Sequence, residues 1–146
     1  MKIQDIVDLW RKDVKIDDVE LDREALNVPI LHAKYLGILS EERLKLRSLK
    51  IRRAELNRKL TDYYRGDLNN PEDLAEIDRE PWPKAVLKQE VVSYVEADEE
   101  MIKLTTRMAM QQETVDVCEE ILKAINSRGY TIKNAIDWRR LTNFGQ

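Results

Sequence analysis

Apolar residues at the start of the chain recur with the period of an α-helix. Ile3, Ile6, Val7 and Trp10 follow one another at spacings of three, one and three, so they share one face of a helical turn. The residues between them are mostly polar. This pattern predicts a short amphipathic helix over residues 2–13, followed by a link.

The pattern predicts two further helices before residue 66. The first would begin at Asp17 or Asp18, which can cap a helix, and end near Gly37 or Ser40. Pro29 lacks a backbone N–H and predicts a kink or break inside it. Ser40 precedes two glutamates and no Gly or Pro follows before Gly66, so the second would run from Ser40 to Tyr64.

Composition changes at residue 67. Residues 67–83 are rich in acidic residues and include Pro81-Trp82-Pro83, which forbids ordinary helix around the tryptophan. We expect an acidic connecting segment, with Trp82 as a docking point. The helical pattern returns over 84–126 as a short piece at 85–95 and a long helix, which Gly129 would end before a final helix capped by Thr131 and running to about Leu141.

The long C-terminal helix carries an apolar seam with a seven-residue repeat. Met101, Met108, Val115 and Leu122 form one series, and Leu104, Gln111, Cys118 and Ile125 follow three residues later. Such a seam packs against a second helix, either of this chain or of another subunit. Gln111, its polar member, could fix the register of the pairing.

These elements predict an all-α fold, an elongated helical hairpin or bundle in one domain of residues 1–146. Within it we expect N-terminal helices over 1–66, the connector over 67–83 and C-terminal helices over 84–146. The composition agrees, since only 4 Gly and 4 Pro occur among 146 residues and 36% of residues are charged.

Several classes of protein are excluded by what the chain lacks. There is no apolar run of about 18 residues and no apolar leader, so we expect an intracellular protein without membrane segments. One cysteine and one histidine exclude structural zinc. No phosphate-binding Gly-rich loop and no HExxH motif occur, which argues against an ATPase, a kinase or a metallohydrolase and predicts no metal and no cofactor.

Charge is strongly segregated along the chain. The net charge of the whole chain is −3, yet residues 43–65 carry +7. The segments 1–42, 66–83 and 84–127 carry −4, −5 and −4, and the last segment, 128–146, carries +3. Local charge decides what a surface binds, so the basic block is the candidate functional site.

A helical projection sorts the basic block into faces. One flank holds Arg43, Arg47, Lys50, Arg58 and Arg65, and the other holds Lys45, Arg52 and Lys59. Arg53 falls within the apolar stripe, together with Tyr63 and Tyr64. Two interpretations are open: the cations bind the phosphates of a nucleic acid, or the acidic segments of the chain neutralise them. The tyrosines could stack on bases, although core packing is favoured by their place on the stripe.

At several points the chain resembles the UvsY family, the recombination mediators of T-even-type phages. The matching strings occur in the same order and at similar spacing: Lys12-Asp13-Val14, Ala33-Lys34-Tyr35-Leu36, Asp62-Tyr63-Tyr64 and Ser127-Arg128-Gly129-Tyr130. In the family a basic pair that contacts DNA lies just ahead of the Asp-Tyr-Tyr string. Arg58-Lys59 occupies that position here, although the order of residues around it differs.

The resemblance implies a non-enzymatic protein that binds single-stranded DNA. It also implies a ring-like homo-oligomer, reported for the family as a heptamer, that loads a strand-exchange recombinase onto DNA covered by single-strand-binding protein in an infected bacterial cytoplasm. Self-association is a property of the family's C-terminal part, where the apolar seam of this chain lies. The rival interpretation is a helical structural or adaptor protein that does not bind DNA. The residues expected to bind DNA are Arg43, Arg47, Lys50, Arg52, Arg58, Lys59 and Arg65; those expected to mediate oligomerisation are Met101, Leu104, Met108, Val115, Cys118, Leu122 and Ile125.

Overall fold

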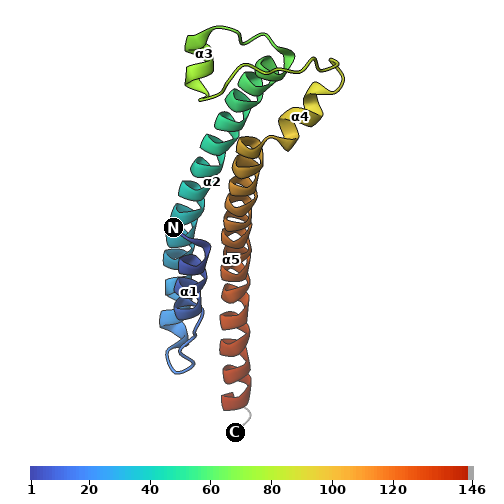
Figure 1. Cartoon of the computed structure of the whole chain (residues 1–146). Coiled ribbons are helices and arrows are strands. Elements are labelled where there is room, and N and C mark those ends of the chain that lie inside the picture. The colour runs from blue at the N-terminus through green and yellow to red at the C-terminus, as the bar shows by residue number, and fades with distance from the viewer. Residues whose placement is uncertain (145–146) are drawn as a thin grey trace. The chain divides into compact units, whose positions relative to one another are not determined.

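A computed structural model describes residues 1–144, and the five elements in this range are all α-helices (Figure 1). The predicted all-α class is confirmed. The chain forms two compact units: unit 1 holds residues 1–45 and the chain from Gln111 onward, and unit 2 holds residues 46–110. This division differs from the subdivision proposed at residues 66 and 83, because segments far apart in the sequence pack together in unit 1.

Helix α1 (Ile3–Asp13) is the first predicted helix. Ile6 is fully buried, and the ring of Trp10 meets that of Tyr35 edge-on with centroids 5.4 Å apart. Asp13 is the last residue of α1, and its carboxylate accepts hydrogen bonds from the Tyr35 hydroxyl at 2.8 Å and from the Lys34 ammonium at 2.6 Å. The apolar face and the terminal carboxylate together attach α1 within unit 1.

Helix α2 (Leu21–Arg65) is a single helix of 45 residues, so the predicted separation into two helices near Gly37 and Ser40 is wrong. Pro29 lies inside it and leaves the carbonyl of Ala25 without its helical N–H donor. Both residues are exposed to solvent, where water can hydrogen-bond that carbonyl. The continuity of the helix through Gly37 and Ser40 follows from buried apolar residues on both sides of them: Leu31, Tyr35, Leu39, Leu46 and Leu49.

Gly66 ends α2 as predicted. Its φ of +82° is in the left-handed region that favours glycine. The N–H of Gly66 donates to the carbonyl of Tyr63 at 3.1 Å, and the N–H of Asp67 donates to the carbonyl of Asp62 at 3.0 Å. These two bonds form the Schellman motif, which satisfies carbonyls that the end of a helix would otherwise leave without donors.

The acidic connector contains an unpredicted short helix, α3 (Pro71–Glu76). Asn70 caps it by accepting a hydrogen bond from the N–H of Glu72 at 3.0 Å, and Pro71 occupies the first helical position. The predicted helix at 85–95 is observed as α4 (Val91–Ala97). It begins six residues later than predicted, and residues 85–90 form no helix.

Helix α5 (Glu99–Phe144) is also continuous, over 46 residues, so Gly129 does not end a helix and Thr131 does not cap one. An internal glycine costs a helix only about 1 kcal/mol relative to alanine. The buried residues Arg128 and Ile132 flank Gly129 and hold the helix in place. Arg128 donates to the carbonyls of Val14 and Lys15 at 2.6 and 3.0 Å and to the carboxylate of Glu24 at 2.6 Å.

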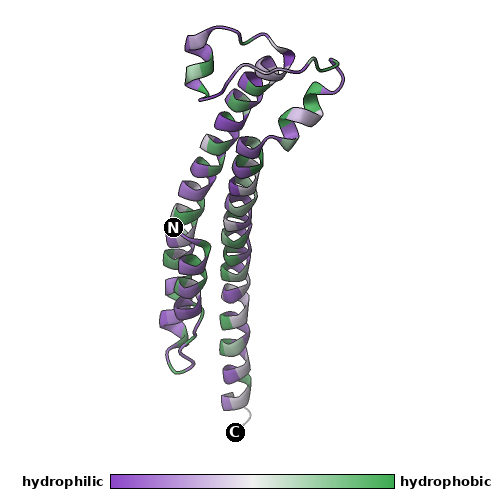
Figure 2. Ribbon diagram, in the orientation of Figure 1, coloured by the Kyte–Doolittle hydropathy of each residue, from purple (hydrophilic) through white to green (hydrophobic). Residues whose placement is uncertain are grey.

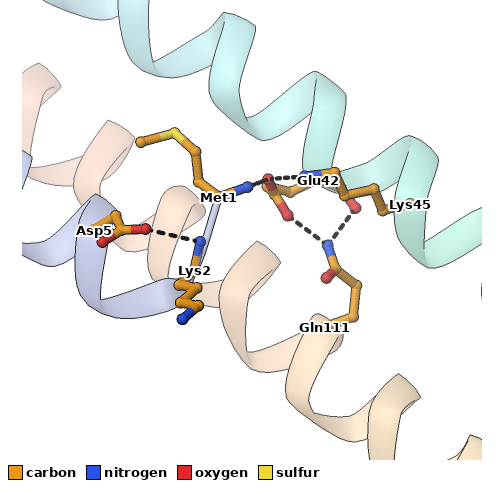
Figure 3. A network of polar contacts seen from close by, with 6 residues as sticks. All are labelled: Met1, Lys2, Asp5, Glu42, Lys45 and Gln111. Atoms are coloured by element: carbon orange, nitrogen blue, oxygen red, sulfur yellow. Dashed lines mark hydrogen bonds and ion pairs between the residues drawn. The ribbon is translucent and has the colours of Figure 1, made fainter.

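Unit 1 contains a nearly fully buried carboxylate, Glu42 (Figure 3). It accepts from the N-terminal ammonium of Met1 at 3.1 Å, from Lys45 at 2.9 Å and from Gln111 at 2.7 Å. Gln111 also donates to the backbone carbonyl of Glu42 at 2.9 Å. Burial alone would raise the pKa of Glu42, but these hydrogen bonds hold it below its ordinary value. Gln111, the polar residue on the predicted seam, thus fixes the register between α5 and α2 within unit 1.

Hydrophilic and hydrophobic residues are mixed along both long helices (Figure 2). Among residues 1–144, none of the helices has a stretch apolar and long enough to cross a membrane.

Candidate nucleic-acid interface

The predicted DNA-binding cations all lie on α2, but they are divided between the two units. Arg43 belongs to unit 1, where its guanidinium pairs with the carboxylate of Glu119 at 2.9 Å. The other predicted cations lie in unit 2: Arg47, Lys50, Arg52, Arg58, Lys59 and Arg65. Arg43 already has an internal partner, so the candidate site is the part of α2 that lies in unit 2.

This part of α2, residues 46–65, carries seven cations and only two carboxylates, a net charge of +5. Within the described residues of unit 2, none of the seven cations forms an ion pair. Lys59 is partly buried and the other six cations are exposed. Arg53 is among the exposed ones; the projection placed it in the apolar stripe, but burial of an unpaired guanidinium is too costly. The positive charge of α2 is therefore available to a ligand.

Tyr63 and Tyr64 belong to the core of unit 2. Each side chain is only 7% exposed, and the two rings pack edge-to-face with centroids 5.2 Å apart. The Tyr63 hydroxyl donates to the carbonyl of Glu80 at 2.8 Å, and that of Tyr64 donates to the Asp98 carboxylate at 2.7 Å. Neither ring can stack on a base while this core stays closed, so the structure supports the favoured alternative of core packing.

Asp98, the residue before α5, accepts several hydrogen bonds within unit 2. Arg79 donates two hydrogen bonds to its carboxylate, at 2.6 and 2.8 Å, and the N–H of Glu100 donates to it at 2.9 Å. Asp98 is 5% exposed. Burial would raise the pKa of Asp98, but the bonds from Arg79 and Tyr64 hold it below its ordinary value. No sequence pattern identified Arg79 and Asp98, because nothing in the sequence indicates that these residues meet.

Trp82 has its docking point in the same unit. Its ring lies 4.7 Å from that of Tyr64 and 5.7 Å from that of Tyr94, measured between centroids. The guanidinium of Arg79 lies 5.1 Å from the ring of Tyr63. The connector is thereby held against the end of α2 that carries the basic residues, which fixes the backbone of this end of the helix.

The residues predicted to mediate oligomerisation are mostly buried within the single chain. In unit 2, Met101 and Leu104 are 2% and 8% exposed; in unit 1, Val115, Cys118 and Ile125 are at most 3% exposed. Met108 and Leu122 are partly buried. A side chain without exposed surface has no area left for a second subunit. The seam therefore packs mainly against other residues of the same chain, which is one of the two possibilities that its sequence pattern left open. Burial also raises the pKa of the Cys118 thiol.

Residues 1–144 hold no group of three or more His, Cys, Asp or Glu side chains placed to bind a metal ion.

Comparisons with known proteins identify the family of the chain. Residues 9–145 match the family described as "Recombination, repair and ssDNA binding protein UvsY". The recombination protein uvsY of Enterobacteria phage T4 is 29% identical over 139 residues, which are 95% of this chain and 96% of that protein.

Solved structures give the same result. A crystal structure of the bacteriophage T4 recombination mediator protein UvsY, lattice type IV, has a TM-score of 0.85 at 26% identity and covers 97% of this chain and 99% of its own. The lattice type II structure has a TM-score of 0.85 at 27% identity and covers 98% of each chain. Almost the whole chain matches one family, by sequence and by fold. The chain therefore belongs to the UvsY family of recombination, repair and single-stranded-DNA-binding proteins.

Proposed function

We propose that the cations of α2 in unit 2 form the surface on which this recombination mediator binds single-stranded DNA. The observation that carries the proposal is that seven cations over residues 46–65 have no ion pair with a described residue of their unit. Phosphates are the ligand class that such a surface favours, because binding releases the counterions condensed on the nucleic acid. The adaptor interpretation required these charges to be neutralised by acidic segments.

The test measures fluorescence anisotropy of a labelled single-stranded oligonucleotide over a series of salt concentrations. Arg58→Ala with Lys59→Ala should lower the slope of log K against log salt by about 1.4, since each phosphate contact on a single strand contributes about 0.7. Lys12→Ala with Lys15→Ala removes the same charge from two exposed lysines outside the surface and should leave the slope unchanged. Equal slopes in the first variant and the unaltered protein would remove this pair from the site.

A mediator acts on proteins as well as on DNA, and we propose a strand-exchange recombinase and a single-strand-binding protein as partners. The acidic segments 1–42 and 66–83 are candidate contact surfaces, and Glu72, Asp73 and Glu76 are exposed on α3. The bound strand would pass from one protein to the other by mass action, without enzymatic turnover, in the infected bacterial cytoplasm. Charge reversal on α3 should weaken recombinase loading and leave DNA binding intact.

We also propose that the protein assembles as a homo-oligomer, for which the family resemblance predicts a heptamer. Since the seam is mostly buried in the chain, the apolar residues left exposed near the end of α5 are the better candidates for the contacts. Tyr130, Trp138 and Leu141 are 73%, 67% and 69% exposed and fall on one side of the helix. Several copies on one strand would raise the effective concentration of each DNA-binding surface.

Sedimentation velocity tests the assembly. Trp138→Ala with Leu141→Ala should shift the protein toward smaller species, whereas Val19→Ala with Leu87→Ala, at positions 80% and 61% exposed elsewhere, should not. A monomer of 17.2 kDa in the unaltered protein would contradict the proposal.

A further inference from the structure

A groove runs between α2 and the first turns of α5 within unit 2. Its volume is about 340 Å³, and each helix supplies two cations to it: Arg52 and Lys59 from α2, Lys103 and Arg107 from α5. The two on α5 lie four residues apart, one helical turn, so they line the same side of that helix. Both are exposed. They belong to the C-terminal helices, whose apolar seam predicts self-association.

The charge of the groove is not balanced by its surroundings. Within the described part of unit 2, none of the four cations forms an ion pair. Two carboxylates, Glu55 and Glu100, also line the groove, which leaves a net charge of +2. Glu100 is shared with Arg79, whose guanidinium lies 4.0 Å from its carboxylate.

The groove also has an apolar component. Leu56 and Leu104 also line it, and Leu104 is only 8% exposed. An apolar wall lowers the local dielectric and strengthens the attraction between the cations and an anion that enters. Four cations around an apolar wall suit a chain that alternates charged and apolar groups, which describes the phosphates and sugar faces of a nucleic-acid backbone.

We propose that Lys103 and Arg107 bind backbone phosphates of the same single strand that Arg52 and Lys59 hold. The strand then lies in a groove between two helices and is contacted from both sides, instead of lying on one face of α2. This inference rests on the proposed function and names residues of α5 as part of the DNA site. A flexible single strand can follow a groove between two helices.

The experiment compares Lys103→Ala with Arg107→Ala against the unaltered protein, using anisotropy of a labelled single-stranded oligonucleotide. At 0.1 M monovalent salt one phosphate contact on a single strand contributes about fivefold in affinity, so losing two should weaken binding about 25-fold and lower the salt slope by about 1.4. The exchange Lys103→Arg with Arg107→Lys keeps both charges and should retain the slope. The control Lys12→Ala with Lys15→Ala should retain both affinity and slope.

A second measurement does not depend on any substitution. Acetylation of lysine amines in the unaltered protein should be suppressed at Lys103 when the oligonucleotide is bound and should continue at Lys12. Unchanged acetylation of Lys103 at saturating oligonucleotide would overturn the inference.

The outcomes separate this inference from the function on which it rests. If the unaltered protein binds the oligonucleotide and the Lys103→Ala, Arg107→Ala variant binds equally well, the α5 side of the groove is not part of the DNA site while the proposed function of the α2 cations stands. If that variant instead loses binding to a polyglutamate peptide only, the groove takes an acidic protein segment and the inference is overturned. No binding by the unaltered protein would reject the proposed function itself.

Discussion

Replacing Asp98 by alanine should destabilise unit 2 more than any exposed substitution in the chain. The change removes a carboxylate that is 5% exposed and that accepts hydrogen bonds from Arg79, Tyr64 and the N–H of Glu100. Removing one partner of a buried ion pair costs about 3–5 kcal/mol, because the remaining charge is left without compensation. Arg79 is 18% exposed in its side chain, so water can reach part of its guanidinium and the lower end of that range applies. We therefore expect a loss of about 3 kcal/mol.

The assay is urea unfolding at fixed protein concentration, followed by tryptophan fluorescence. The ring of Trp82 packs against Tyr64, which loses the acceptor of its hydroxyl. Trp10→Phe and Trp138→Phe, made in both the reference and the variant, leave Trp82 as the fluorophore that reports on the affected core. Asp116→Ala is the control: Asp116 is exposed on α5 and accepts one hydrogen bond from Gln112, and a change of at most about 0.5 kcal/mol is expected. A loss below about 1 kcal/mol for Asp98→Ala would refute the view that this carboxylate organises unit 2.

The same site gives a pH dependence with a definite sign. The hydrogen bonds to Asp98 hold its pKa in the folded protein below the ordinary value of 3.8, despite burial. A carboxylate with a depressed folded pKa contributes stability that is fully present above its unfolded pKa and is lost as pH falls through the folded value. The stability of the unaltered protein should therefore fall below about pH 4, and that of Asp98→Ala should fall less steeply in unfolding curves recorded at pH 3–6.

Three further predictions concern other parts of the chain. Gly66→Ala should cost about 1–2 kcal/mol, since φ is +82° there. Gly37→Ala should instead add about 0.5–1 kcal/mol, because Gly37 lies in the interior of α2 and the added methyl group meets no side chain within 4 Å. Equal effects in urea unfolding would contradict the conformational argument. Gln111→Ala should cost about 1–3 kcal/mol in the same assay, because it removes the donor to Oε2 of the buried Glu42. A neutral result would mean that water replaces the amide. Cys118 is fully buried and burial raises its pKa, so a disulfide reagent should modify it only after denaturant is added; rapid native modification would show that unit 1 opens.

Local sequence signals predicted the parts of the fold that depend on local chemistry. The apolar spacing from Ile3 to Trp10 identified α1, and Gly66 identified the end of α2. Pro29, Gly37 and Gly129 predict ends or breaks of helices, because each disfavours a helix locally. In the structure the buried apolar residues on both sides of these positions outweigh a local cost of about 1 kcal/mol for glycine and about 3 kcal/mol for proline.

The candidate site was predictable in its charge and not in its contacts. Counting charges by segment identified the basic block. The position of a residue along α2, however, does not reveal that Arg43 has Glu119 as an ion-pair partner while Arg58 has no such partner in its unit. Glu119 lies 76 residues from Arg43 in the sequence, and Asp98 lies 19 residues from Arg79. Such pairs arise from tertiary packing, which periodicity on one helix does not describe. For the same reason the seam of α5 could be recognised as a packing surface without its partner being known.

The connection between Arg128 and the link after α1 has a consequence for the order of assembly during translation. Arg128 hydrogen-bonds to the carbonyl of Val14, 114 residues earlier, so the contacts of unit 1 close one of the longest loops that this chain allows. Unit 2 is made from the uninterrupted segment 46–110 and needs only shorter loops, which cost less entropy to close. We expect amides of unit 2 to gain protection first in pulse-labelled hydrogen exchange during refolding. On the ribosome, the basic surface would then be in place while the N-terminal helix still awaits its partner, and a nascent chain could encounter nucleic acid before its own synthesis is finished.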